Sequence, residues 1–550
     1  MRSPLAAPRR RILLFSFLVF LTLHPLRALD FNSPGDPAVL AEALAARMSD
    51  EEALAQTFMF GWTGTGPSPL ILDWIRIRRI GGIKVFGWNI RDLETLTETI
   101  GILQRASLGG PLKIPLLAAT DQEGGMVRHV KDRTSDTPGN MAIGAGAFPE
   151  DAYYAGYYIG RELALLGINM NFAPVVDLAT SRDSVLLGTR SFGEDPVQAG
   201  ILGLAFMRGQ TRAGIISTAK HFPGHGATSL DSHGTLPRIA ADERLLWDRE
   251  LVPYRMLIRG GLPAVMSGHL AFPRTPAGDI PASLAPWFLQ TLLRNRMGFR
   301  GMVITDDLRM HGAFLTTGSL SRTARQALWA GNDMLLISST PGMNDQVWTE
   351  LLDWMKRERP FRERVRDAAR RVLALKLIHL RREGAASPIP DPDRLRREIP
   401  DPQAEAFFQD LAARSVTVIK KEGIPLDPAS AGRVLLAGRH WNFINAGRRA
   451  YPKAAVYSWE ESANAATLRT FAQGADTVIL CMENPGDLQL LESLRSLNKR
   501  TVVFSVSASA YPDKNSWVHA AAVLYSTAEE SFIAGFSVLL GRINGGGAIP

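Results

Sequence analysis

Five short stretches of the sequence place ionisable or polar side chains directly after an apolar run. They are Asp121-Gln-Glu-Gly-Gly125, Asn171 with Asp177, Lys220-His-Phe-Pro-Gly-His-Gly226, Ser267-Gly-His269 and Thr305-Asp-Asp307. Carboxylates, imidazoles and a lysine in one pocket can supply a nucleophile, proton exchange and hydrogen bonds to a polar substrate. The sequence therefore predicts an active site, provided that the fold brings these stretches together.

A sixth stretch, Asp231-Ser-His233, has the spacing of an oriented general acid or base. A carboxylate two residues before a histidine can accept a hydrogen bond from one imidazole nitrogen. That bond fixes the tautomer and leaves the other nitrogen to exchange protons. The plainer interpretation is an aspartate in a loop turn beside a surface histidine.

Other residues in these stretches also have purely structural interpretations. Asp306 or Asp307 could cap a helix that begins near Leu308, because Asp is favoured at the N-cap. One aspartate can cap while its neighbour faces a pocket. Lys220 could be a solvated lysine at a strand end, and His225, which lies between two glycines, could serve only to shape its loop.

Eight apolar runs alternate with helical stretches between about residues 38 and 383. The runs cover residues 56–62, 82–86, 115–120, 168–173, 215–219, 264–267, 302–305 and 334–337. Apolar runs separated by helices indicate a parallel sheet covered on both faces, and eight repeats predict a closed (β/α)8 TIM barrel over residues 35–383. Active sites of such barrels form at the carboxyl ends of the strands, where the five stretches would meet.

A breaker-rich segment follows the predicted barrel and indicates a linker over residues 384–402. Beyond it, residues 403–550 resume the alternation on a smaller scale. The candidate strands there cover residues 416–419, 434–437, 455–457, 478–481, 502–506 and 522–525. The sequence therefore predicts an α/β protein in which the barrel is followed by a smaller α/β sandwich domain.

Residues 1–28 have the pattern of a secretory signal peptide. Arg9-Arg-Arg11 precedes an apolar segment, residues 12–23, which is short for a transmembrane helix. An uncleaved N-terminal anchor is the alternative. The single cysteine, Cys481, excludes a disulfide within the chain. We expect an exported protein, periplasmic or extracellular.

The charge pattern gives little support for a nucleic-acid partner. The net charge is +8, but five arginines and no acidic residue precede residue 29, and no long basic run follows. We expect a monomer that has no cofactor, no metal and no stable membrane partner beyond an uncleaved anchor.

The motifs together resemble family 3 glycoside hydrolases, specifically their bacterial β-N-acetylglucosaminidase branch. The resemblance covers roughly residues 45 to 380. It rests on Asp121-Gln-Glu-Gly-Gly125, Arg190-Ser-Phe-Gly193, Lys220-His-Phe-Pro-Gly-His-Gly226, Asp231-Ser-His233 and Ile304-Thr-Asp-Asp-Leu308. It implies a retaining enzyme that removes β-linked N-acetylglucosamine from peptidoglycan- or chitin-derived glycans.

The resemblance also implies roles for individual residues. Asp306 matches the nucleophile that forms a covalent glycosyl-enzyme, His233 the acid/base, and Asp231 its orienting partner. Residues that would hold the sugar hydroxyl groups are Asp121, Arg190, Lys220 and His221, and His269 matches a pocket position by placement alone.

One position departs from the pattern of this branch. An arginine is expected eight residues after Asp121, but His129 stands there and Arg128 precedes it. Either the chain shifts locally to present Arg128 to the sugar, or His129 takes the place of the arginine.

Four alternatives to this function remain open at the level of sequence. A β-glucosidase-type enzyme could take its acid/base from the second domain, where Glu483 is the candidate. A histidine acid/base would repel phosphate less than a carboxylate would, which allows phosphorolysis. A metal-dependent hydrolase could use His221, His225, His233, Asp231 and Asp306 as ligands. A non-catalytic sugar-binding protein could use exposed aromatic residues such as Trp62 and Trp88.

Overall fold

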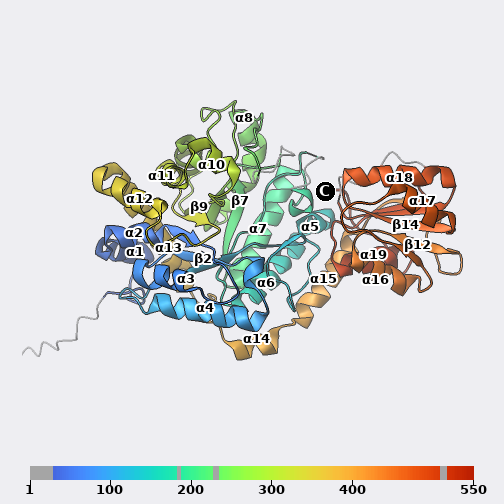
Figure 1. Cartoon of the computed structure of the whole chain (residues 1–550), viewed down its shortest axis with the longest axis horizontal. Helices are drawn as coiled ribbons and strands as arrows, with labels where there is room; N and C mark the ends of the chain where they lie inside the picture. Colours follow the sequence, from blue (N-terminus) through green and yellow to red (C-terminus); the bar gives the residue numbers. More distant parts are fainter. Residues whose placement is uncertain (1–28, 182–186, 227–233, 508–516) are drawn as a thin grey trace, which may run out of the picture.

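The computed structural model of the chain describes residues 29–181, 187–226, 234–507 and 517–550. Two sheets with covering helices form two domains that lie side by side, the first colored blue to yellow and the second orange to red (Figure 1). The predicted signal peptide lies outside the described residues. Of the helices within the described ranges, none has the length and apolar character needed to cross a membrane.

The first domain is the predicted barrel. Its eight parallel strands are β1 (Phe58–Phe60), β2 (Gly82–Lys84), β3 (Leu117–Thr120), β6 (Met170–Asn171), β7 (Ile216–Phe222), β8 (Ala264–Ser267), β9 (Met302–Thr305) and β10 (Leu335–Ile337). They pair in the order β10-β1-β2-β3-β6-β7-β8-β9, and a parallel bridge between Ile304 and Met334 joins the two ends. All eight predicted strands are present, and the barrel is confirmed.

Helices surround the barrel. The longer ones are α1 (Pro37–Arg47), α4 (Leu93–Leu108), α6 (Pro149–Leu165), α7 (Pro196–Arg212), α9 (Leu251–Arg259), α11 (Leu320–Ala330), α12 (Gln346–Arg357) and α13 (Arg359–Leu380). In the interior that the strands enclose, buried side chains such as Met59, Phe172, Met266 and Met302 fill the barrel. Polar groups at the carboxyl ends therefore rest on an apolar floor.

The second domain contains a six-stranded sheet. Its strands are β11 (Thr417–Lys421), β12 (Val434–Ala437), β13 (Ala455–Tyr457), β14 (Thr477–Met482), β15 (Arg500–Ser505) and β16 (Ala520–Val523). The order is β11-β16-β15-β14-β12-β13, and only β11 runs antiparallel. Helices α16 (Trp441–Ala450) and α19 (Glu529–Leu539) pack on one face, and α17 (Ala465–Gln473) and α18 (Leu488–Leu494) pack on the other. The predicted α/β sandwich is confirmed.

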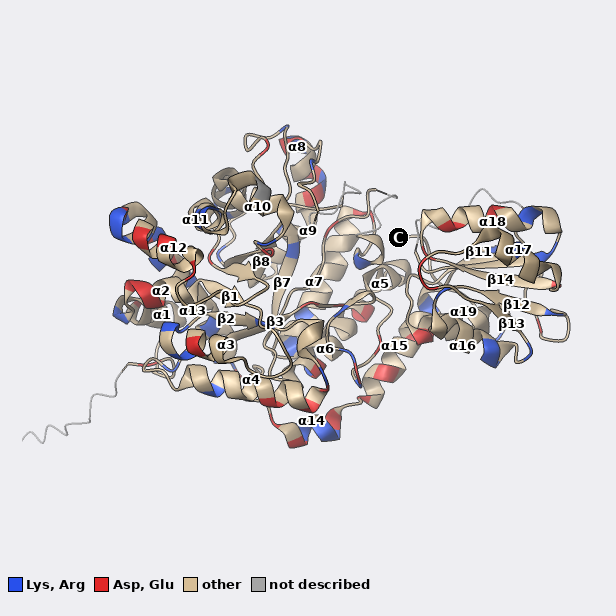
Figure 2. Cartoon of the chain, in the orientation of Figure 1, with Lys and Arg blue, Asp and Glu red and all other residues tan. Residues whose placement is uncertain are grey.

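The segment predicted as a linker packs tightly on the barrel. It contains α14 (Pro392–Glu398), and the side chains of Leu395 and Ile399 are buried in the barrel core. Helix α15 (Pro402–Ser415) then leads to the second domain (Figure 1). Helix α14 carries both acidic and basic residues (Figure 2), and Arg394 forms an ion pair with Glu398.

The second domain contacts the barrel through α5 (Asn140–Gly146). Met141 and Ala145 pack against Val523 and Tyr525, and the N–H of Ala548 donates to the carbonyl of Ala145 at 3.0 Å. Helix α5 in turn supports the mouth of the barrel, because Asn140 donates a side-chain hydrogen bond to the carbonyl of Arg190 at 2.8 Å.

Candidate active site

Asp121 lies at the carboxyl end of β3 between two lysines. Lys220 Nζ in β7 is 2.5 Å from Oδ1, and Lys84 Nζ at the end of β2 forms an ion pair with Oδ2. His129 Nε2 is 3.6 Å from Oδ2. Burial opposes ionisation of Asp121, but Lys220 and Lys84 outweigh it and hold its pKa well below the usual value. Asp121 is thus an ionised acceptor at the mouth.

Glu123 connects the same network to Arg190. Its carboxylate is fully buried and accepts two hydrogen bonds from the Arg190 guanidinium, both at 2.8 Å. Lys220 Nζ is 2.6 Å from Glu123 Oε1, so this lysine bridges two carboxylates. The paired geometry fixes the guanidinium plane. Burial alone would lower the pKa of Lys220, but Asp121 and Glu123 raise it above the usual value.

Asp177 orients the loop that follows β7. Its Oδ2 is 2.7 Å from His221 Nδ1, and its Oδ1 accepts the backbone N–H groups of His221 and His225 at 3.1 and 2.8 Å. In a neutral imidazole, a carboxylate on Nδ1 favours the tautomer with its proton there, in which Nε2 is an acceptor. His225 is buried, neither of its ring nitrogens has a hydrogen-bond partner among the residues that the structure describes, and burial lowers its pKa.

Asp306 follows β9 directly and is partly buried. Its backbone N–H donates to the carbonyl of Ser267 at 3.0 Å, and its Oδ1 accepts the N–H of Asp307 at 2.8 Å. Its Oδ2 accepts no hydrogen bond from any residue that the structure describes. Burial raises its pKa, but His221, His269 and the Asp307 N–H outweigh that effect and lower it below the usual value. Asp306 is therefore anionic, with one oxygen available to a substrate.

Asp307 has the structural role that the sequence left open for one of the two aspartates. Its Oδ1 accepts the backbone N–H groups of Arg309 and Ser338, at 3.1 and 3.2 Å. Helix α10 begins later than expected, at His311. The buried ring of His269 supports the same turn, since Nε2 is 3.1 Å from the Asp307 carbonyl and Nδ1 is 2.7 Å from Ser283 Oγ.

The predicted site residues fall into three groups. The network at the mouth joins Asp121, Lys220 and Arg190, and both His221 and Lys220 lower the pKa of Asp306. Arg128 lies apart from this network, because its guanidinium pairs with Asp136 and its Nε donates to the Val130 carbonyl at 3.3 Å. His129 takes the place beside Asp121. A sugar contact from Arg128 stays a prediction.

Asp231 and His233 form the third group, and they lie outside the described residues. The described chain ends at Gly226 and resumes at Gly234. The acid/base assignment therefore stays a prediction from the sequence.

Three residues of the network had no individual role in the sequence prediction. Lys84 was not named, and Glu123 and Asp177 were named only within the polar stretches that follow apolar runs. Lys84 was hidden within an apolar run, although a lysine in a buried parallel strand needs a charged partner and was itself a signal. Its side chain is 1% exposed. Burial lowers its pKa, partly offset by Asp121.

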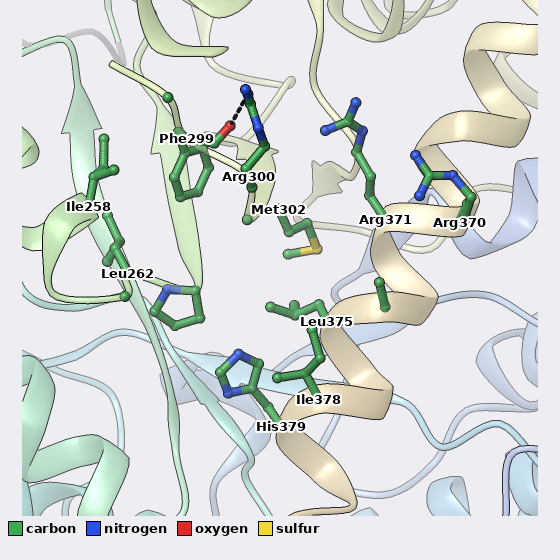
Figure 3. A pocket seen from close by; sticks show the side chains of 15 residues that line it. Ile258, Leu262, Phe299, Arg300, Met302, Arg370, Arg371, Leu375, Ile378 and His379 are labelled. Atoms are coloured by element: carbon green, nitrogen blue, oxygen red, sulfur yellow. Dashed lines mark hydrogen bonds between the residues drawn. The ribbon is translucent and has the colours of Figure 1, made fainter. Parts of the chain in front are cut away.

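A cavity of about 580 Å³ lies at the opposite end of the barrel, among the loops before β8 and β9 and the end of α13. Apolar side chains such as Leu262, Met302 and Leu375 line it, with Arg371 and His379 beside them (Figure 3). Burial lowers the pKa of His379 to about 4. This cavity is at the amino ends of the strands and is separate from the charged network.

Within residues 29–181, 187–226, 234–507 and 517–550, no three His, Cys, Asp or Glu side chains are grouped so that they could hold an ion.

Comparison with known proteins identifies the family. The model of the glycosyl hydrolase family 3 N-terminal domain matches residues 65–375. A β-hexosaminidase from Thiobacillus denitrificans is 38% identical over 288 residues, which cover 50% of this chain and 76% of that protein.

Two solved structures are similar across both domains. A family 3 β-N-acetylglucosaminidase from Paenibacillus sp. superposes with a TM-score of 0.80 at 27% identity, over 92% of this chain and 98% of that one. A fungal multi-domain family 3 β-N-acetylglucosaminidase gives 0.83 at 28% identity, over 92% of this chain but only 60% of that longer chain. From the match over most of the barrel, we conclude that the chain belongs to glycosyl hydrolase family 3 and is a glycoside hydrolase.

Proposed function

We propose that the chain is a retaining β-N-acetylglucosaminidase that removes terminal β-linked N-acetylglucosamine. The observation that carries this proposal is the placement of Asp306, an anionic residue at the end of β9 whose Oδ2 accepts no hydrogen bond from a described residue. The relatives named as a β-hexosaminidase and as β-N-acetylglucosaminidases support the choice of sugar.

Hydrolysis would proceed in two displacements at the anomeric carbon. Asp306 attacks that carbon as the glycosidic C–O bond breaks, and His233 donates its proton to the departing oxygen. His233 then accepts a proton from water, which attacks the glycosyl-aspartate and releases the sugar. Asp231 would hold the imidazole in the required tautomer. The roles of Asp231 and His233 rest on their sequence motif.

The network around Asp121 would bind the hydroxyl groups of the terminal sugar. A carboxylate has about four acceptor sites, so Asp121 keeps capacity for two hydroxyl donors after Lys84 and Lys220 take one site on each oxygen. Lys220, Arg190 and His221 would complete the subsite.

The natural substrate and location form part of the proposal. The signal-like pattern of residues 1–28 supports export, and an exported enzyme of this specificity would meet peptidoglycan- or chitin-derived glycans. Amino-terminal sequencing of protein recovered from the periplasm and the medium would test this. A mature chain that begins near residue 29 is expected, and full-length protein confined to the cytoplasm would contradict export.

Hydrolysis of chromogenic β-N-acetylglucosaminide and β-glucoside by wild type and Asp306→Ala tests the activity. Wild type should prefer the N-acetylglucosaminide, and the variant should hydrolyse neither. A preference for the glucoside would overturn the assigned sugar. If sugar 1-phosphate forms when phosphate is present, the reaction is phosphorolysis and the proposal of hydrolysis is wrong.

A further inference from the structure

Trp88 is an exposed aromatic residue that the proposed mechanism does not use. It follows β2 in a short 3-10 helix, η2 (Gly87–Asn89), and 55% of its surface is exposed. Its ring stacks on Phe86 with a centroid distance of 4.2 Å and an interplanar angle of 9°. One face of the indole is therefore covered by Phe86 and the other is open to solvent. Trp62 is only 1% exposed and offers no such surface.

Hydrogen bonds fix the position of the indole. Trp88 Nε1 donates to the carbonyl of Trp62 at 3.1 Å, and Asn89 Nδ2 donates to the same carbonyl at 2.9 Å and to that of Gly64 at 2.8 Å. A ring held in this way loses little conformational entropy when a ligand covers it. Two other exposed tryptophans, Trp329 and Trp441, stack on no ring of the described residues.

The Trp88 platform adjoins the network around Asp121. The Phe86 centroid is 4.3 Å from Lys84 Nζ and 5.6 Å from the ring of His129. Both of those side chains contact Asp121. A continuous set of contacts thus leads from the buried carboxylate to the exposed indole at the rim of the barrel mouth.

We propose that Trp88 is a stacking platform for a second sugar ring, adjacent to the subsite of the terminal sugar. The faces of a pyranose ring present C–H groups, which pack well against an aromatic surface, while its edge hydroxyls stay in water. The terminal sugar needs the polar network, whereas the open indole face offers no polar partner. Because the enzyme removes terminal residues, the second ring lies on the leaving-group side. This inference rests on the proposed function.

The test compares substrates with and without a second ring. Methyl β-N-acetylglucosaminide has none, and N,N′-diacetylchitobiose has one; aromatic leaving groups are avoided because they could themselves stack on Trp88. Released N-acetylglucosamine is measured for wild type, Trp88→Ala, Trp88→Phe and the control Trp329→Ala. Trp329 lies on α11 and is 46% exposed.

Trp88→Ala should raise KM for the disaccharide about 5-fold, the loss of roughly one aromatic contact, and leave kcat/KM for the methyl glycoside within about 2-fold. Trp88→Phe should restore most of the affinity, and Trp329→Ala should match wild type. Equal losses on both substrates, or an unchanged KM for the disaccharide, would overturn the platform.

A failure of the proposed function would be recognised separately, because wild type would then hydrolyse neither substrate. In that case quenching of tryptophan fluorescence by N,N′-diacetylchitobiose still tests the platform. Quenching should be present in wild type and lost in Trp88→Ala, and quenching that persists in the variant would exclude Trp88 as its source.

Discussion

Charged residues follow parallel strands in both domains, but the two sheets arrange them differently. In the barrel, Lys84, Asp121 and Lys220 come from three different strands and meet in one set of buried ion pairs. In the second domain, Arg439 follows β12 and Glu483 follows β14, and their side chains pair at 3.1 Å with Glu483 half-buried. A closed sheet directs all strand ends around one mouth, whereas an open sheet joins only the ends of neighbouring strands.

From this difference we expect the barrel to carry the chemistry and the second domain to support it. The second domain packs on α5, and α5 holds the carbonyl of Arg190. A Cβ added at Gly193, in the same motif as Arg190, would lie only 2.9 Å from Pro550. The second domain therefore positions the loop that carries Arg190, and its own charged pair need not take part in catalysis.

The largest expected effect separates the two aspartates after β9. Asp306→Ala should lower kcat by at least about 10⁴-fold, because loss of a nucleophile removes the covalent route. Asp307→Asn, the matched control, should keep the larger part of the activity and mainly lower the free energy of unfolding, since Asp307 anchors backbone N–H groups. Equal losses in kcat from steady-state kinetics would contradict this division of roles.

The second-largest expected effect distinguishes the barrel from the second domain as the source of the catalytic general acid. His233→Ala should slow natural disaccharides by about 10²–10⁴-fold, while substrates with good leaving groups suffer less. Glu483→Gln should change neither class by more than about 2-fold. The reverse result in kcat/KM measurements would place the acid on the second domain.

A smaller effect is expected for Lys84, which secures one oxygen of Asp121. Lys84→Met should raise KM about tenfold, as expected for one lost charge-assisted hydrogen bond. Asp121 would lose one of the side chains that depress its pKa, while Lys220 and His129 remain. Its pKa should rise, so protonation begins at higher pH as the solution is acidified. The acid limb of the kcat/KM profile should shift upward, and an unshifted limb with an unchanged KM would contradict the role of Lys84.

Lys376 is the matched control, because it is also a buried lysine of the barrel but lies away from the mouth. Its Nζ donates to Gln56 Oε1 at 2.9 Å, and burial lowers its pKa to about 7. Lys376→Met should leave KM unchanged. The unfolded chain binds more protons than the folded chain between about pH 7 and the ordinary lysine pKa of 10.5, so wild-type stability should rise with pH across that window.

The variant should lack this contribution and should be the more stable protein near pH 7, by about 1.4 kcal/mol for each unit of the pKa shift. Urea unfolding at several pH values measures the difference. Parallel stability curves for wild type and Lys376→Met would show that burial of Lys376 does not lower its pKa.

The strands and the two-domain order were predictable, because apolar runs alternating with helices leave few arrangements. Asp121, Lys220 and Asp306 were predictable as polar residues at strand ends, whereas Arg190 was predictable only from the family resemblance. Which side chains pair with one another was not predictable, because pairing depends on the direction in which each side chain points. Nothing in the sequence distinguishes Arg128, which turns to Asp136, from His129, which turns to Asp121. Similarly, Lys84 joins the site only because β2 and β3 are neighbours.

Covalent trapping tests the central claim most directly. Incubation with a fluorinated N-acetylglucosamine analogue that carries a good leaving group should slow the second displacement, and the glycosyl-enzyme should accumulate. Peptide mass spectrometry should then locate one added sugar on Asp306 in wild type and none in Asp306→Ala. A label on another residue, or full turnover with inversion at the anomeric carbon and no label, would contradict the proposed mechanism.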